Sequence, residues 1–216
     1  TVRITHAHAL GSTSGATTVE YGGRLEVSGG ITVAEPLSLS GSGTGNNGAV
    51  QAQSGGATLS GPVTLPGPHA RIYSSGGNTL TLSGGITSSA STYTTINAAG
   101  GTLRITGKPI SIGTGYFNSD QGGTFALGVG GNVWGDTSLY LVTLRTEAAN
   151  ALPPATKVRM AGTATLDLNG FDQTAGSVWS PDSASTAASI TSAAPATLTV
   201  SPAADALYCG RLAGAL

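Results

Sequence analysis

Residues 57–87 read ATLSGPVTLPGPHARIYSSGGNTLTLSGGIT and contain two close copies of one short segment. The first copy is ATLSG at 57–61 and the second is LTLSG at 80–84, and two more versions, LRITG and FALG, begin at 103 and 125. The apolar residues at the four centres are spaced by 23, 23 and 22 positions and are Leu59, Leu82, Ile105 and Leu127. A repeat of this length is typical of proteins that stack one structural unit many times.

Two further series of apolar segments share this period. The first has spacings of 22, 24 and 21 and is centred on Val50, Ile72, Ile96 and Phe117. The second has spacings of 23, 24 and 23 and is centred on Val63, Ile86, Ile110 and Val133. Each segment is short, alternates apolar with polar residues and is bounded by glycine or proline pairs, which predicts strands and turns. No long window carries an apolar stripe with helical spacing.

Three short strands per repeat predict an all-β fold, a parallel β-solenoid with about 23 residues in each three-strand coil. Each strand then pairs with its equivalent in the next coil, at about 4.8 Å. The 216 residues give roughly nine coils, hence a rod of about 40–45 Å. We expect Leu59, Leu82, Ile105 and Leu127 to form an apolar ladder along the axis of this rod.

The whole chain, 1–216, is expected to be a single solenoid domain. Residues 1–48 predict irregular coils, with Pro36–Gly48 as an insertion or an irregular coil, whereas 49–135 are regular and 136–204 are looser. Residues 205–216 are more apolar and predict a cap or a contact segment, since the ends of a solenoid expose strand edges. The candidate residues for self-association in this segment are Leu207, Tyr208, Cys209, Leu212 and Leu216.

Composition excludes several classes of protein. Hydrophobic residues make up 39% of the chain and the mean hydropathy is +0.13, which argues against disorder. Charged residues make up only 9%, the net charge is −1, and no basic run marks a nucleic-acid partner. No apolar stretch is long enough for membrane insertion. Cys209 is the only cysteine, so an internal disulfide and a cysteine-based zinc site are excluded. Because the sequence begins at Thr1, we expect a processed protein or a piece of a longer one.

Two stretches resemble a known repeat class. LSLSGSGTGNNGAVQAQSGGATLSGPVTL, followed by RIYSSGGNTLTLSGGIT, is similar to the autotransporter-associated β-strand repeats of bacterial surface proteins. The stretch LPPATKVRMAGTATLDLNGFDQTAGSV at 152–178 resembles the same family. The resemblance covers roughly 37–178 and implies a right-handed parallel β-helix that is extracellular or bound to the bacterial cell surface. It also implies a passenger fragment or a separately secreted subunit.

Few residues are candidates for catalysis or for binding a metal or a cofactor. Gly43–Gly48 matches G-x-G-x-x-G, but no helix is predicted after it, so we interpret it as a glycine-rich turn and expect no cofactor. His6 and His8 would share one face of a strand, but a metal needs a third ligand, and the remaining histidine, His69, is distant in the sequence. Asp120 and Glu147, 27 positions apart, are the carboxylates nearest to the coil period.

Aromatic residues offer another possibility, since exposed rings can stack on sugars. The candidates are Tyr73, Tyr93, Tyr116, Phe117, Trp134 and Trp179. For most of them we expect packing in the core or at corners. Cys209 is interpreted as a small buried hydrophobe, with an intermolecular link as the alternative.

Together these features predict a non-enzymatic, extracellular structural solenoid that associates end to end with further copies into a filament. One alternative is a monomeric adhesin or passenger fragment that binds surface glycans. A carbohydrate-active β-helix is the other, and it would need acids or aromatic residues gathered on one exposed face.

Overall fold

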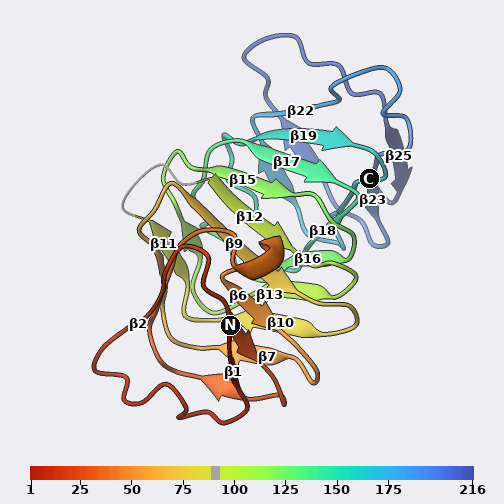
Figure 1. The fold of residues 1–216 in the computed structure, drawn as a ribbon. Coiled ribbons are helices and arrows are strands. Elements are labelled where there is room, and N and C mark those ends of the chain that lie inside the picture. Colours follow the sequence, from red (N-terminus) through yellow and green to blue (C-terminus); the bar gives the residue numbers. More distant parts are fainter. Residues whose placement is uncertain (89–92) are drawn as a thin grey trace.

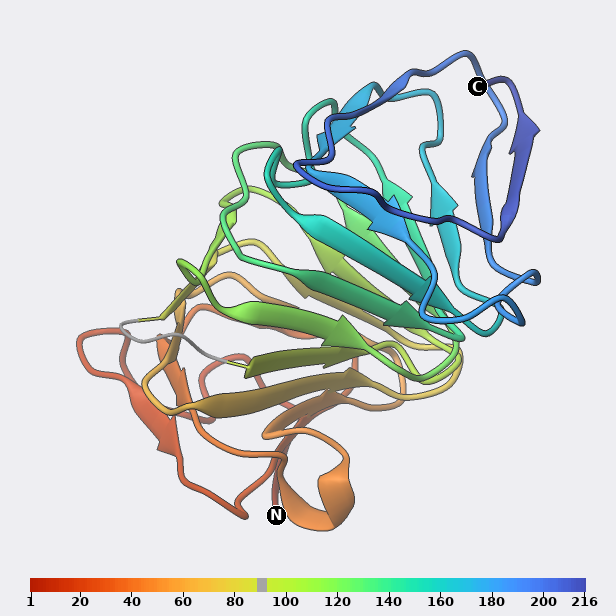
Figure 2. The same cartoon turned by 90° about the horizontal axis from the view of Figure 1, so that it is seen from above.

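The computed structural model of the chain describes residues 1–88 and 93–216. Within these ranges the chain forms 25 short strands and one 3-10 turn, Thr44–Asn46, and no α-helix. The strands stack as a β-solenoid of about nine coils of about 23 residues (Figures 1 and 2). Every pairing between named strands is parallel. The predicted parallel β-solenoid is therefore confirmed.

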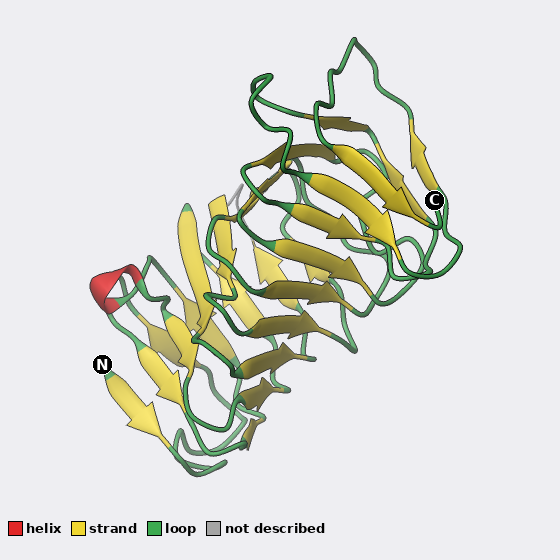
Figure 3. Cartoon of the chain, turned by 90° about the vertical axis from the view of Figure 1, so that its right-hand side faces the viewer, coloured by secondary structure: helices red, strands yellow, loops and turns green. Residues whose placement is uncertain are grey.

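Each coil contributes strands to three walls, which we call sheets 1, 2 and 3 (Figure 3). Sheet 1 has nine strands: β1 (Val2–Ile4), β3 (Leu25–Val27), β6 (Val50–Ala52), β9 (His69–Ser74), β12 (Tyr93–Asn97), β15 (Tyr116–Ser119), β17 (Thr137–Tyr140), β19 (Lys157–Ala161) and β22 (Ser177–Trp179). Sheet 2 has nine strands: β4 (Thr32–Val33), β7 (Ala57–Leu59), β10 (Thr79–Leu82), β13 (Thr102–Ile105), β16 (Thr124–Leu127), β18 (Thr143–Thr146), β20 (Thr165–Asp167), β23 (Ser189–Ser192) and β25 (Arg211–Gly214).

Sheet 3 is shorter. It has five strands: β2 (Thr17–Val19), β5 (Leu37–Leu39), β8 (Val63–Leu65), β11 (Ile86–Ser88) and β14 (Ile110–Ser111). Later coils close this wall with loops and with a separate pair, β21 (Gln173–Ala175) and β24 (Leu198–Val200). Within the described ranges, no helix has the length and apolar content of a membrane span.

The predicted core ladder is present in sheet 2. Leu59 lies opposite Leu82, Leu82 opposite Ile105, and Ile105 opposite Leu127. All four side chains are fully buried. Burial of one such side chain contributes about 1.5–3 kcal/mol, so the same small gain recurs in every coil.

The last members of the other two series do not lie opposite the residues that their spacing predicts, although Phe117 is itself buried in the core. Phe117 lies opposite Thr94 and not opposite Ile96. Val133 lies opposite Ser111 and is half exposed, while its neighbour Trp134 is buried. Ring packing inside the core accompanies the shift, since Phe117 stacks on Phe125 at 4.8 Å and on Trp134 at 5.0 Å between ring centroids.

Side-chain amides replace the missing strands of sheet 3. The Oδ1 atom of Asn132 accepts a bond from the Ile110 N–H at 2.8 Å, and its Nδ2 atom donates to the Ala151 carbonyl at 2.8 Å. Gln173 Oε1 accepts from the N–H groups of Ala151 and Leu152. These bonds satisfy buried backbone groups that a strand ladder would otherwise pair.

The N-terminal region is more regular than its sequence indicates. The first part of Pro36–Gly48 forms β5, which pairs with β2 and β8 like any other strand of sheet 3. Only the second part is a projecting loop, and it includes the 3-10 turn. Arg24 Nη1 donates to the Thr44 carbonyl, and Arg71 Nη1 donates to the Asn46 carbonyl, so an arginine directly before β3 and an arginine of β9 hold this loop.

At some sharp corners between strands, only glycine fits the backbone conformation and the space available. Gly56 has a φ of +71°, and a Cβ atom there would lie 2.5 Å from the Thr79 carbonyl oxygen in the next coil. Glycine adopts this conformation without steric cost. The corner thus needs glycine for both its backbone angle and its clearance.

Candidate functional site

The C-terminal end of the solenoid exposes part of its core. Leu212 on β25 lies opposite Ile190 and continues an inward-facing row of sheet 2. No strand follows β25 in that sheet, so Leu212 is 70% exposed although Ile190 is buried. Leu207 and Leu216 are also exposed. Three of the five candidate residues for self-association thus present apolar surface at one end.

The other two candidate residues are half-buried. The Tyr208 hydroxyl donates to the Arg211 carbonyl at 3.3 Å, and burial raises the pKa of Tyr208 to about 12. The Cys209 N–H donates to Ser180 Oγ at 3.1 Å. Cys209 is free and only partly covered, so the expectation of a buried cysteine holds in part.

A cavity of about 380 Å³ opens at this end. Its apolar lining joins the last coils to the terminal segment and consists of Val178, Ile190, Ala196, Leu198, Val200, Tyr208, Leu212 and Leu216, with Thr197. Residues 205–216 therefore do not close the core as a cap. They add one more strand, β25, and leave the end of the core open.

The N-terminal end is partly covered. The loop that links β1 to β2 carries Leu10, which packs against the core. Val2 on β1 remains 61% exposed. The outer edges of β1, β2 and β4 have no strand partner within the described chain. This end offers parallel strand edges, and that of β4 lies in the same sheet as the exposed edge of β25 at the other end.

The outer face of sheet 1 gathers most of the exposed aromatic side chains. They alternate with inward residues along the strands and are His69, Tyr73, Tyr93, Tyr116, Tyr140 and Trp179. The ring of Tyr93 stacks on His69 at 5.6 Å and on Tyr116 at 5.1 Å. Burial, with a smaller contribution from Arg71, lowers the pKa of His69. Burial, with smaller contributions from Tyr116 and Asp120, raises the pKa of Tyr93.

This arrangement corrects the expectation that most of the six aromatic candidates lie in the core or at corners. Phe117 and Trp134 are buried, but the other four lie on the outer face of sheet 1. Tyr93 and Tyr116 are 23 positions apart and occupy equivalent outward positions. That spacing was the signal for an aromatic row. By contrast, the outer row of sheet 3 holds only hydroxyl side chains: Thr18, Ser38, Thr64, Thr87 and Ser111.

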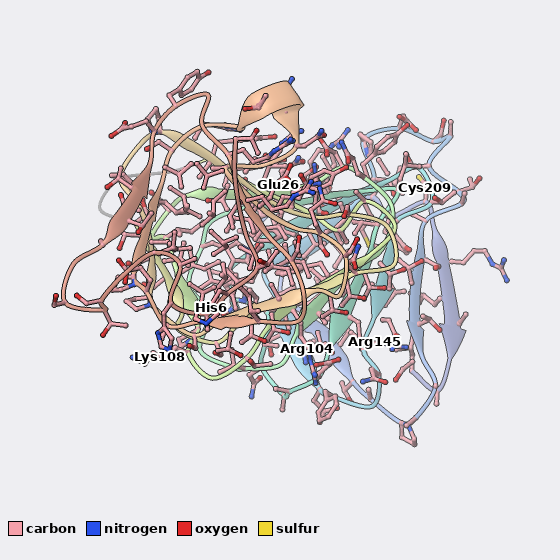
Figure 4. The ribbon with its side chains drawn as sticks, turned by 60° about the horizontal axis from the view of Figure 1, so that its bottom comes forward. His6, Glu26, Arg104, Lys108, Arg145 and Cys209 are labelled. Atoms are coloured by element: carbon pink, nitrogen blue, oxygen red, sulfur yellow. The ribbon has the colours of Figure 1, made fainter. Side chains whose placement is uncertain are left out.

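A buried ionic cluster lies near the N-terminal end of sheet 1. Glu26 is almost fully buried and accepts from Arg3 and Arg24, each at 2.8 Å. Figure 4 shows Glu26 near the projecting loop, with Arg104 and Arg145 away from it on sheet 2. Because Arg24 also holds the loop, the cluster is fully explained by its structural role.

The remaining chemical candidates are not brought together. His6 and His8 lie in the loop after β1 and not on a strand, with ring centroids 5.7 Å apart, while His69 lies on β9. Asp120 faces Arg71 at 3.8 Å from sheet 1, whereas Glu147 accepts from Arg104 of sheet 2 at 2.6 Å.

Gly43–Gly48 forms the 3-10 turn and its flanks, as the interpretation of a glycine-rich turn requires. Among residues 1–88 and 93–216, no group of three histidine, cysteine or acidic side chains is placed to hold a metal ion.

Comparison with known proteins finds no matching family model, no similar curated protein and no similar solved structure. The function is therefore argued from the geometry of this chain.

Proposed function

We propose that this chain is a non-enzymatic structural β-solenoid whose C-terminal end stacks on the N-terminal end of a second copy. The observation that carries the proposal is the open core at β25, where Leu212 occupies an inward position and is nevertheless 70% exposed. Exposed apolar surface of this kind marks a site of association.

The two ends are suited to one another because every strand runs parallel to its neighbours. An incoming β4 can extend sheet 2 beyond β25 in the same direction, whereas residues 203–207 of the same chain already lie beyond β22 in sheet 1. The contact joins different surfaces of two copies and leaves a free end on each, so it builds an open filament. The net charge of −1 adds little repulsion between copies.

The proposed location is outside the cell or on a bacterial surface. It rests on the resemblance of residues 37–65, 71–87 and 152–178 to surface-protein repeats. A monomeric adhesin is the second candidate, and the aromatic outer face of sheet 1 favours it. The carboxylates of Asp120 and Glu147 are each engaged with a different arginine, which gives a carbohydrate-cleaving function no support.

The test compares the association state of the wild-type chain with that of Leu212→Arg. We expect the wild type to form particles longer than a single rod of about 45 Å in negative-stain images and to sediment as a series of oligomers. The charged side chain of Leu212→Arg should block the apolar end and leave monomers.

The matched control is Val133→Arg, which places the same charge at a half-exposed valine on the side of the rod. It should associate like the wild type. Stacking is disproved if the wild type is monomeric at high concentration, or if both variants behave alike.

A further inference from the structure

A second feature of the C-terminal region is a pocket of about 600 Å³ on the outer side of β22. Its walls come from two successive passes of the chain. Pro154, Lys157, Ser177 and Trp179 line one side, and Asp205 and Leu207 line the other. This pocket differs from the cavity at the open core, which Ile190, Leu212 and Leu216 line.

The pocket exists because the chain leaves the strand path after sheet 1 ends. β22 is the last strand of sheet 1, and the next segment to reach this wall, around residues 203–207, does not pair with it as a strand. The Ser180 N–H donates to the Leu207 carbonyl at 2.8 Å and ties the two passes together at one point. The pocket is thus bounded by this chain alone and needs no second copy.

The Trp179 ring has a cation beside it and also lines the pocket. Trp179 lies opposite Arg159 of β19, and the Arg159 guanidinium carbon sits 5.9 Å from the ring centroid. The cation comes from β19, and residues 203–207 form the wall of the pocket opposite Trp179. Because a cation already draws on the π electrons of the ring, a second cation is disfavoured there. A flat, uncharged C–H surface suits the part of the ring that lines the pocket.

The rim of the pocket carries one donor and one acceptor of opposite charge. Lys157 and Asp205 both line it, and neither belongs to the ion pairs found in the described part of the chain, all of which use arginine. An ammonium group only donates hydrogen bonds and a carboxylate only accepts them. Hydroxyl groups do both, and the two charges together favour a neutral molecule.

We propose that this pocket binds a pyranose ring of a neutral saccharide, with its C–H face on Trp179 and its hydroxyl groups between Lys157 and Asp205. A pocket with an apolar lining and a few polar groups is the usual form of a small-molecule site. The proposal gives the solenoid a ligand in addition to its structural role, and it holds whether or not copies stack.

The test is a calorimetric titration of the full chain with cellohexaose, maltohexaose and xylohexaose. It is carried out in the Leu212→Arg background, so that stacking neither hides nor mimics binding. We expect saturable binding of at least one of the three sugars. Trp179→Ala should weaken it by about tenfold or more, the factor that corresponds to about 1.4 kcal/mol.

Two further variants and a fluorescence measurement sharpen the result. Lys157→Met and Asp205→Asn should each weaken binding several-fold, whereas Tyr140→Ala, on the same outer face but outside the pocket, should not. Trp134 is buried, so a change of tryptophan emission on titration reports Trp179. The proposal is overturned if none of the three sugars binds saturably, or if Trp179→Ala binds as tightly as its parent.

Discussion

Two buried threonines of the core differ in whether their hydroxyl groups have a hydrogen-bond partner. Thr94 faces inward between Ala70 and Phe117, and its hydroxyl has no hydrogen-bond partner among the described residues. Thr137 is equally buried, but its hydroxyl accepts from Trp134 Nε1 at 2.8 Å and is bonded to Thr156 Oγ1 at 2.8 Å. An unpaired buried hydroxyl costs free energy, and a paired one does not.

We therefore predict opposite effects of one substitution at these two sites. Thr94→Val should raise the free energy of unfolding by about 1 kcal/mol, because it removes an unpaired polar group at nearly constant volume. Thr137→Val should lower it by about 1–3 kcal/mol, because it leaves the Trp134 N–H and the Thr156 hydroxyl without this partner. Urea unfolding of both variants checks this, and a loss of stability in Thr94→Val contradicts it.

Two corner glycines allow the cost of a left-handed backbone to be measured apart from the cost of a steric clash. Gly56 and Gly77 have φ angles of +71° and +74°, but only Gly56 lies close to another coil, whereas Gly77 has nothing within 4 Å of a built Cβ atom. Gly77→Ala should cost only the left-handed conformation, about 1–2 kcal/mol. Gly56→Ala should cost clearly more, because its Cβ meets the Thr79 carbonyl. Equal losses of stability in denaturant titrations would rule out the corner geometry.

At the scale of the element, the central strands of sheet 2 could be predicted from the sequence. Their inward positions carry similar aliphatic residues at a nearly constant spacing. Sheets 1 and 3 depart from the pattern where Phe117 and Trp134 enter the core. The alternation of apolar and polar residues does not decide whether Val133 or Trp134 faces the core, since both side chains are apolar. The choice depends on ring contacts with Phe117 that arise only after the coils have stacked.

Of the two candidate surfaces at the C-terminal end, one could be predicted from the sequence and the other could not. Leu212 and Leu216 were identifiable because the terminal segment is apolar, and a chain of stacked coils must end on strand edges. The pocket at Trp179 was not identifiable. It depends on residues 203–207 failing to pair with β22, and neither spacing nor composition predicts such a departure from the strand path.

The C-terminal segment has a pH dependence of its own. Tyr208 has a pKa of about 12 in the folded chain, above the ordinary 10.0, so the folded state holds this proton more tightly than the unfolded state. The stabilisation is complete below pH 10 and is lost as the pH rises through about 12.

We predict that the urea midpoint of the wild type falls more steeply between pH 9.5 and about 11.5 than that of Tyr208→Phe, which cannot ionise. Parallel slopes for the two proteins would contradict the raised pKa.

At the scale of the whole molecule, stability is built from contacts between adjacent coils. Each coil adds apolar residues to the axial ladders and bonds to its neighbour through parallel strands. Several of the few charges pair across coils, as Arg145 does with Asp167 at 2.8 Å. In sheet 2 this pairing runs through nine strands and ends at the exposed edge of β25. The proposed stacking of a second copy would continue this pairing at β25.

The most direct test of the account measures distances along the outer row of sheet 2. Thr79, Thr165 and Ser189 lie in this row, with Thr165 four coils and Ser189 five coils from Thr79. Spin labels at 79 and 165, and at 79 and 189, are compared by pulsed electron resonance in a Cys209→Ser background. Stacked coils predict separations of about 19 Å and about 24 Å, which differ by a single step of about 4.8 Å. Two separations that do not differ by one such step would contradict the stacking of coils in register.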